Sequence, residues 1–430
     1  MKIWIKLFLV LTQLTFAQDV LNYSDALKIA IEKNTSVLVF KNEKQTQHLK
    51  NNAGNAGLSP TVSLNANLNF SNLNSYQEFS SGTIQDRTGA KSNNVAASAN
   101  VNWVIFDGFK MFAVKKKLSS NENISDLQLK KQIEDVIVEI TAGYYEVVRL
   151  NKLLAVANEN LSLLRKRKEI SEEKFKIGSG SGIDLLTCKT DENKALSEVY
   201  NLEWLIVKSK SELNKALLKD VNEDFKTRDT IEVNFEPNID ELTKLKSQNT
   251  GLLISKELEK QAKYSLDESR SYYMPYVQLN GSYNFTRNTS QAGFIFQNRQ
   301  NGISAGLSAG WTIFNGNKNS RMYKEKQIAL LNTALNTTDL NKQYESIIYI
   351  NVQAFLTHKK IYKLELANLN DSRELLTVAD ERYKIGRSDL IQVREAQKNF
   401  TEAQSRCINS LYNLKMAEVE LLRTSGQLIK

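Results

Sequence analysis

The side chains best suited to chemistry follow two short glycine-containing turns. Asp184 comes six residues after Gly178, and Gln392 and Glu395 come six and nine residues after Gly386. In a symmetric oligomer these positions would form rings, and a ring of carboxylates at a constriction selects for cations and can bind a divalent ion. The residues alone favour a plainer interpretation, in which they form an exposed polar face of an ordinary helix.

Other kinds of site have little support. The chain has two histidines and two cysteines, and neither pair has the neighbours that a metal site needs. A disulfide between Cys188 and Cys407 is possible, but no pattern supports it. The glycines at 178, 180 and 182 lack the Lys-Ser/Thr ending of a phosphate-binding loop, so they indicate a tight turn between helices. We therefore predict no enzyme activity, no cofactor and no metal. The modest positive charge of +9 does not indicate nucleic-acid binding.

The sequence is internally duplicated. Residues 101–110 recur at 309–318, and residues 173–178 recur at 381–386, both 208 positions later. Pro60, Leu64 and Phe70 recur 215 positions later as Pro275, Leu279 and Phe285. A repeat of this length predicts a duplicated architecture. We divide the chain into residues 1–17, a first repeat at 18–226 and a second repeat at 227–430.

The first 17 residues are typical of a secretory signal peptide. Lys2 and Lys6 precede a short apolar run, and Thr15-Phe16-Ala17 ends in a small residue before Gln18. No cysteine follows the expected cleavage site, so a lipoprotein anchor is not expected. No later stretch is apolar enough for a transmembrane helix, and only β-strands could then enter a membrane interior.

Four segments alternate between apolar and polar residues with a period of two, which predicts β-strands at 60–72, 95–106, 276–287 and 302–314. Each is about as long as the 9–11 residues that a transmembrane strand needs. The polar connections 73–94 and 288–301 suit extracellular loops. The alternative is a pair of hairpins in a soluble β-sandwich. Four strands cannot close a barrel, so strands in a membrane would require oligomerisation; the residues leave two copies and three copies open.

The remaining segments predict long helices. Residues 109–177 contain one glycine and no proline, and their apolar residues follow a heptad pattern that predicts coiled-coil packing. Residues 317–385 match them in the second repeat. Shorter helices are expected at 183–218 and 389–424 after the glycine turns, and at 25–50 and 240–270 before the strand pairs.

The order helix, strand pair, long helix, turn and shorter helix, written twice, resembles the TolC-type outer-membrane efflux proteins. The resemblance covers nearly the whole chain behind the signal peptide. Its most specific pieces are Phe-Lys-Ile-Gly at 175–178 with Ile-Asp-Leu at 183–185, Tyr-Lys-Ile-Gly at 383–386 with Ile-Gln-Val at 391–393, and Leu-Leu-Arg-Thr-Ser-Gly at 421–426. It implies a mixed α/β membrane protein: a homotrimer whose twelve-stranded β-barrel in the outer membrane continues as a long α-helical coiled-coil barrel in the periplasm.

The resemblance also implies roles at the two turns. A closed periplasmic gate would involve Asp184, Tyr383 and an arginine; that position holds Ser388 here, with Arg387 adjacent. Gln392 and Glu395 match two aspartate rings at the aperture, so one ring would be neutral and cation block weaker. Contacts with a periplasmic adaptor are expected at the two tips, in Lys176, Ile177 and Gly178 and in Lys384, Ile385 and Gly386.

The implied function is an exit duct that carries small molecules from an inner-membrane RND or ABC transporter, through the adaptor, to the outside. One alternative is the outer-membrane component of type I protein secretion. Another is a structural or adhesive coiled-coil protein of the envelope without channel activity.

Overall fold

The computed structural model describes residues 20–228, 230–233, 246–292, 295–385 and 387–429. The expected signal peptide lies outside these residues. The chain forms two compact units, and each takes segments from both repeats. The helical unit comprises Met1–Phe40, Leu129–Thr250 and Lys342–Lys430, and the sheet unit comprises Lys41–Gln128 and Gly251–Asn341. The boundary between the two compact units therefore does not coincide with the boundary between the two sequence repeats.

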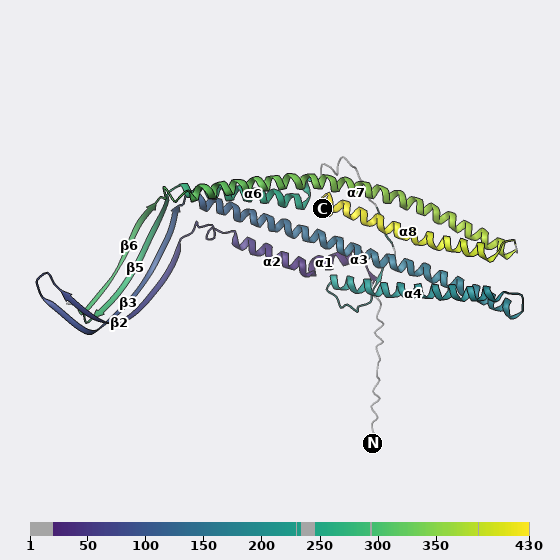
Figure 1. Ribbon diagram of the computed structural model, residues 1–430, viewed down its shortest axis with the longest axis horizontal. Coiled ribbons are helices and arrows are strands. Elements are labelled where there is room, and N and C mark those ends of the chain that lie inside the picture. Colours follow the sequence, from purple (N-terminus) through teal and green to yellow (C-terminus); the bar gives the residue numbers. More distant parts are fainter. Residues whose placement is uncertain (1–19, 229, 234–245, 293–294, 386, 430) are drawn as a thin grey trace, which may run out of the picture. The chain divides into compact units, whose positions relative to one another are not determined.

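The sheet unit contains four antiparallel strands, β2 (Thr61–Glu78), β3 (Ile84–Phe106), β5 (Tyr276–Ser290) and β6 (Gln297–Gly310), in the order β2-β3-β5-β6 (Figure 1). All four predicted strands are present. The long loops predicted at 73–94 and 288–301 are wrong, because pairing continues to Glu78–Ile84 and Thr289–Gln297. Strand pairing uses backbone groups, so it extends beyond the point where apolar alternation stops.

The last predicted strand ends earlier than expected. Its counterpart β3 continues to Phe106 because Trp103, Val104 and Phe106 pair with β5. β6 ends at Gly310, and residues 311–314 have no strand partner within the described part of the chain. A strand cannot be continued without a neighbour that accepts and donates its backbone hydrogen bonds.

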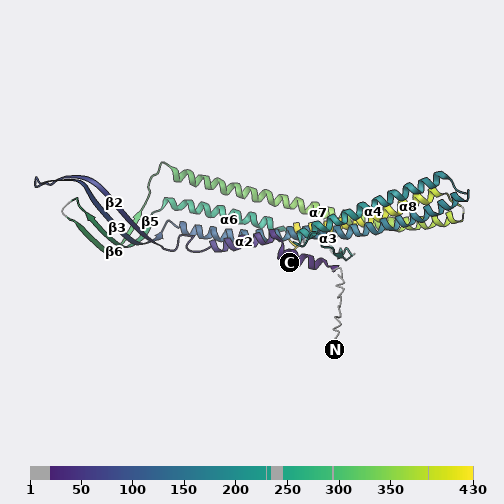
Figure 2. The same ribbon diagram turned by 90° about the horizontal axis from the view of Figure 1, so that it is seen from below.

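The two long helices are α3 (Lys110–Lys176) and α7 (Lys318–Lys384), each of 67 residues. In the helical unit, α3 packs against α4 (Gly182–Ala216), and α7 packs against α8 (Leu390–Thr424), as both views show (Figures 1 and 2). The predicted heptad seam is confirmed in the first hairpin. Leu150, Ala157 and Leu161 of α3 form one buried cluster with four α4 residues, Ala195, Val199, Leu202 and Ile206.

The helices before the strand pairs differ from the prediction. The helix expected at 25–50 is broken at Asn34 into α1 (Tyr23–Lys33) and α2 (Thr35–Lys50). The Asn34 side chain accepts hydrogen bonds from the backbone N–H groups of Ser36 and Val37, which starts a new helix. In the described part of the helix expected at 240–270, a 3-10 turn (Lys246–Gln248) precedes α6 (Thr250–Arg270). Residues 240–245 of that prediction lie outside the described part of the chain.

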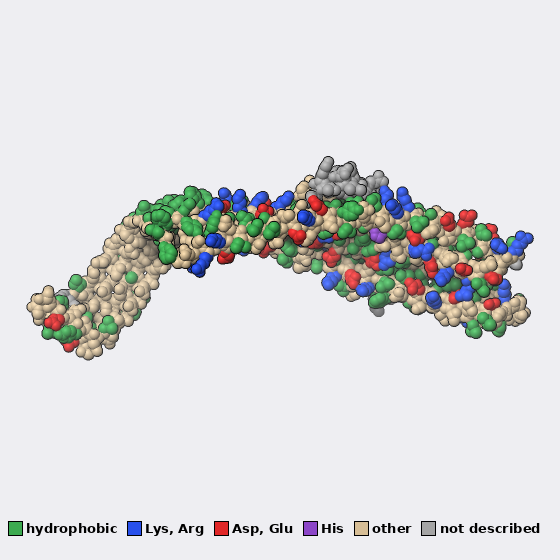
Figure 3. Space-filling model, turned by 45° about the horizontal axis from the view of Figure 1, so that its top comes forward, with side chains coloured by type: hydrophobic (Ala, Val, Ile, Leu, Met, Phe, Trp, Pro, Cys, Tyr) green, Lys and Arg blue, Asp and Glu red, His purple; other side chains and the backbone are tan. Residues whose placement is uncertain are grey.

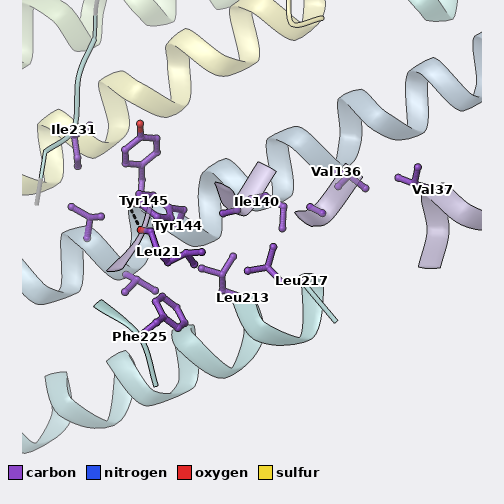
Figure 4. Close-up of a cluster of buried hydrophobic side chains, with 14 residues drawn as sticks. Leu21, Val37, Val136, Ile140, Tyr144, Tyr145, Leu213, Leu217, Phe225 and Ile231 are labelled. Carbon is purple, nitrogen blue, oxygen red and sulfur yellow. Dashed lines mark hydrogen bonds between the residues drawn. The ribbon is translucent and has the colours of Figure 1, made fainter. Parts of the chain in front are cut away.

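The largest core of the helical unit joins segments that are far apart in sequence (Figure 4). Tyr144 of α3 is almost fully buried, and its hydroxyl donates a 3.0 Å hydrogen bond to the carbonyl of Leu21. Leu21 belongs to β1 (Val20–Leu21), which pairs in parallel with β4 (Lys226–Thr227). The end of the first repeat thus packs on its beginning, and Leu213 and Phe225 complete the cluster.

Among the described helices, none combines the length and apolar character required for a membrane span. Cys188 and Cys407 are both buried and free, so they do not form a disulfide.

Candidate functional site

The two hairpin tips have matching backbones. In the first, Gly178 adopts a φ of +76°, and the N–H of Ser179 donates to the carbonyl of Lys174 at 2.9 Å. In the second, the N–H of Arg387 donates to the carbonyl of Arg382, also at 2.9 Å. Gly386 lies outside the described residues.

The tips present exposed cations and isoleucines. Lys176 and Lys384 are exposed, and Ile177 and Ile385 are 78% and 65% exposed. Isoleucine at such exposure gains nothing from the core of its own chain. Together with Gly178, these residues form a surface suited to contact with another protein.

Asp184 and Tyr383, predicted to act together, line one groove of about 810 Å³ between the two hairpins. The ammonium group of Lys174 lies 5.6 Å from the centroid of the Tyr383 ring, which is a cation–π contact. Among the described residues, no hydrogen bond joins Tyr383 to Asp184. Asp184 and Tyr383 therefore share one groove, and the contact observed at the Tyr383 ring is with Lys174.

Lys384 also lines this groove, whereas Arg387, Gln392 and Glu395 are not among its lining residues. Gln392 accepts a 2.8 Å hydrogen bond from the hydroxyl of Ser388, and its own N–H donates to the carboxylate of Asp389 at 2.9 Å. Glu395 is exposed on α8, as is Arg387 in the turn before it. No hydrogen bond or ion pair joins these three residues to Asp184 within the described part of the chain.

Sequence reasoning missed the polar contacts that join the two hairpins. The Arg394 guanidinium lies 2.8 Å from the Asp191 carboxylate, and the Gln397 amide donates to Asn160 at 2.7 Å. Gln397 is buried on α8, and a buried polar residue between Val393 and Phe400 was the available signal. Burial also lowers the pKa of Arg167, which faces the Asp191 and Asp380 carboxylates and the Arg394 cation.

The sheet forms a second candidate surface, in which register separates two faces. Leu64, Ala99, Tyr283 and Ile303 form one row across the four strands, whereas Ser63, Asn100, Ser282 and Ser304 form the next. The polar face is linked by hydrogen bonds such as Ser282–Ser304 at 2.7 Å and Asn280–Ser308 at 2.8 Å. Figure 3 shows charged side chains gathered over the helices and few on the sheet in view.

No group of three or more His, Cys, Asp or Glu side chains in the described residues could hold a metal ion. The geometry offers two other features: a sheet with one apolar face and one polar face, and two helical hairpins that are joined near their tips by polar contacts.

Comparison with known proteins agrees with this geometry. Residues 244–427 match the family described as outer membrane efflux protein. The chain is 18% identical over 319 residues to the outer membrane protein TolC of Vibrio cholerae, covering 71% of this chain and 70% of that protein.

Two solved structures have closely similar folds. VceC of Vibrio cholerae superposes with a TM-score of 0.80 at 14% identity, covering 94% of this chain and 96% of that chain. The CmeC outer membrane channel of Campylobacter jejuni superposes with a TM-score of 0.80 at 15% identity, covering 95% and 86%. The resemblance to the TolC-type outer-membrane efflux proteins is thus confirmed: residues 244–427 match the outer membrane efflux protein family, and the described fold is similar to the folds of VceC and CmeC.

Proposed function

We propose that three copies of this chain form the outer-membrane exit duct of a tripartite efflux system. Their sheets would close a twelve-stranded barrel, and their helices would extend into the periplasm. The duct would receive small molecules from an inner-membrane RND or ABC transporter through a periplasmic adaptor that binds the hairpin tips. The chain supplies a passage and contact surfaces, and no catalytic step is assigned to it.

One observation carries this proposal: the sheet has an apolar face, an uncharged polar face and two unpaired edges. β2 and β6 each pair with one neighbour only in the described chain. Beyond β6, Trp311, Ile313 and Phe314 are 59%, 82% and 77% exposed. Open strand edges cannot exist in lipid, because each unpaired backbone group costs several kcal/mol. Another copy of the chain is the simplest partner for both edges.

The internal repeat specifies how the edges would meet. In the internal repeat, β2 corresponds to β5 at an offset of 215 residues, and β3 corresponds to β6 at an offset of 208 residues. The pair Leu64–Ala99 of β2 and β3 therefore corresponds to Leu279–Leu307, which is a pair that β5 and β6 make. The same correspondence can be applied to the β3–β5 pairs. Ala99 of β3 then corresponds to Leu307 of β6, and Tyr283 of β5 corresponds to Leu68 of β2 in the next copy. Leu307 and Leu68 would therefore lie side by side across the two copies, and the apolar residues of both copies would share one face.

The number of copies follows from pore size. Two copies would give eight strands, and barrels of about eight strands have interiors that side chains fill. Three copies would give twelve, which leaves a wet interior lined by the Ser and Asn face. The resemblance to the efflux family favours the same number.

Disulfide trapping tests the proposed closure. Neighbouring residues across strands have Cβ atoms about 5 Å apart, so Leu68→Cys with Leu307→Cys should cross-link copies on mild oxidation. Leu64→Cys with Leu307→Cys is the matched control, because a four-residue displacement moves the thiols about 13 Å along the strand. Equal cross-linking of both pairs, or none from either, would count against this register.

The gate can be tested in planar bilayers. Asp184→Ala combined with Tyr383→Phe should raise conductance by loosening the tips, and absence of any conductance in the native and variant proteins would contradict the duct and favour a structural envelope protein. Glu395→Gln should lower cation selectivity, because it removes the proposed charged ring. An unchanged reversal potential would remove Glu395 from the aperture.

A further inference from the structure

The apolar face of the sheet ends in a pair of arginines. Going from the helix-bearing end toward the hairpin loops, β5 presents Leu279, Gly281, Tyr283 and Phe285 on this face, and the next residue on the same face is Arg287. Directly opposite Arg287 on β6 lies Arg299. On β3 and β2, the same row is apolar, with Val95 and Leu68.

Neither arginine has an anionic partner among the residues that the structure describes. Arg299 stacks over Phe285, with the guanidinium carbon 5.3 Å from the ring centroid, so it lies against the apolar face. Arg287 is exposed, and neither arginine makes an ion pair with a residue that the structure describes. Like charges directly opposite each other on neighbouring strands are destabilising. An external anion between them would convert this repulsion into attraction.

The distance along β5 between the arginine pair and the opposite end of the sheet indicates where that anion would come from. From Val277 to Arg287 the strand advances ten residues, or about 34 Å at about 3.4 Å per residue. With the usual tilt of about 40°, this corresponds to a vertical height of about 26 Å, close to the roughly 25 Å apolar band of outer-membrane barrels. The helices attach at the Val277 end, so the arginines lie near the hairpin loops at the opposite membrane surface.

We propose that Arg287 and Arg299 form a binding site for the phosphate group of an anionic outer-leaflet lipid, whose acyl chains cover the apolar rows below. This rests on the proposed function, because it requires that the apolar face be the outside of the barrel. Two guanidinium groups offer planar, bidentate recognition of a phosphate. Free inorganic phosphate has the same head-group chemistry but lacks the chains that would contact Phe285 and Tyr283.

The test uses the full-length protein in detergent, with lipid binding measured by native mass spectrometry. Bisphosphorylated lipid A, dephosphorylated lipid A and inorganic phosphate are the three probes. Arg287→Gln with Arg299→Gln should weaken binding of the phosphorylated lipid by about tenfold or more, as expected for loss of a charge-assisted contact. Lys131→Gln with Lys194→Gln removes the same charge from exposed positions on α3 and α4 and should leave binding unchanged.

The outcomes separate the possibilities. Preference for the phosphorylated lipid that is lost only in the arginine variant supports the site. Equal binding of the phosphorylated and dephosphorylated lipids would overturn the proposal, as would retention of the preference in the arginine variant. If inorganic phosphate binds as tightly as the lipid, the ligand of this site is a free anion and the lipid proposal is wrong. Arg287→Lys with Arg299→Lys keeps the charge and should retain part of the affinity. Conductance measured on the same samples tells whether the duct itself is intact, so failure of the site and failure of the duct are distinguishable.

Discussion

The two strand-to-helix junctions are nearly identical in backbone and different in surroundings. Gly108 and Phe109 have φ values of +71° and +71°, and Gly316 and Asn317, 208 positions later, have +68° and +62°. Each junction is also held by a tryptophan: the indole N–H groups of Trp103 and Trp311 donate 3.0 Å hydrogen bonds to the carbonyls of Leu58 and Tyr273, respectively.

The surroundings differ at the glycines. A Cβ added to Gly108 would lie 2.7 Å from the carbonyl oxygen of Ser271, whereas a Cβ on Gly316 would meet nothing within 4 Å. Ser271 belongs to the second repeat, so the first junction is packed by the second. The second junction would find the equivalent neighbour only in another copy of the chain. At these junctions the backbone is duplicated and the packing is not, which is in keeping with the proposed ring of several copies.

The largest expected effect comes from adding a methyl group at these glycines. Gly108→Ala has two unfavourable effects: a left-handed backbone strain of about 1–2 kcal/mol, and overlap of the new methyl group with backbone atoms of Ser271. We therefore expect misfolded protein in low yield. Gly316→Ala has the strain without the overlap in a single chain. We expect native helix content by circular dichroism but a reduced fraction of trimer by native mass spectrometry.

Residues 56–59 of the next copy, the counterparts of 271–274, would supply the missing overlap at Gly316. If Gly316→Ala assembles as well as the native chain, the space beside Gly316 is empty in the oligomer too. Oligomer symmetry would then not explain why the surroundings of Gly108 and Gly316 differ.

The second prediction compares contacts between and within hairpins. Arg394 pairs with Asp191 of the other hairpin at 2.8 Å, whereas Arg406 pairs with Glu365 of its own hairpin at 3.1 Å. Arg394→Ala should increase single-channel conductance several-fold by freeing the hairpins from each other. Arg406→Ala removes a similar ion pair and should leave conductance near the native value. Both pairs are partly exposed, so each should change stability by no more than about 1 kcal/mol. Similar conductances in the two variants would show that this ion pair does not restrain the tips.

The third prediction concerns a buried carboxylate present in one repeat only. Glu134 accepts a 2.8 Å hydrogen bond from the hydroxyl of Thr250, and burial raises its pKa above 4.5. Lys342 occupies the corresponding position 208 residues later. A raised pKa means that the folded state holds the proton more tightly than the unfolded state, so the free energy of unfolding falls as pH rises from about 4.5 through the raised pKa.

Glu134→Gln keeps a hydrogen-bond acceptor for Thr250 and removes the titration. Its stability relative to the native chain should therefore increase across this pH window and level off above it, as measured by denaturant unfolding at successive pH values. Glu139→Gln, at an exposed position on the same helix, should show no such trend. A constant difference between Glu134→Gln and the native chain would show that Glu134 titrates normally.

The sequence allowed the fold to be predicted wherever a periodic pattern was long. The heptad residues of α3 and the alternating strands were found because apolar residues recur along them at fixed spacing. The break at Asn34 and the extension of β2 to Glu78 were missed, since one depends on a cap and the other on backbone pairing beyond the apolar pattern. At the tip, Asp184 and Tyr383 were paired by resemblance, but the Asp191–Arg394 contact joins residues 203 positions apart and has no local signature.

The smallest expected effect concerns the caps of the two return helices. Ser181 accepts a hydrogen bond from the N–H of Ile183 at 3.2 Å, and Asp389, 208 positions later, accepts one from Gln392 at 2.9 Å. The aspartate is charged and so also interacts favourably with the helix dipole. Asp389→Ala should destabilise the start of α8 by about 1 kcal/mol and Ser181→Ala that of α4 by about half as much. Hydrogen exchange of the first-turn amides measures both directly.

A further variant tests whether the caps alone distinguish the two tips. Ser181→Asp should slow amide exchange at the start of α4 until it matches that at the start of α8. If exchange does not slow, the tips differ in their loops and not in their caps. Gly180, whose added Cβ would lie 2.8 Å from the backbone nitrogen of Phe175, is then the residue that sets the first tip apart.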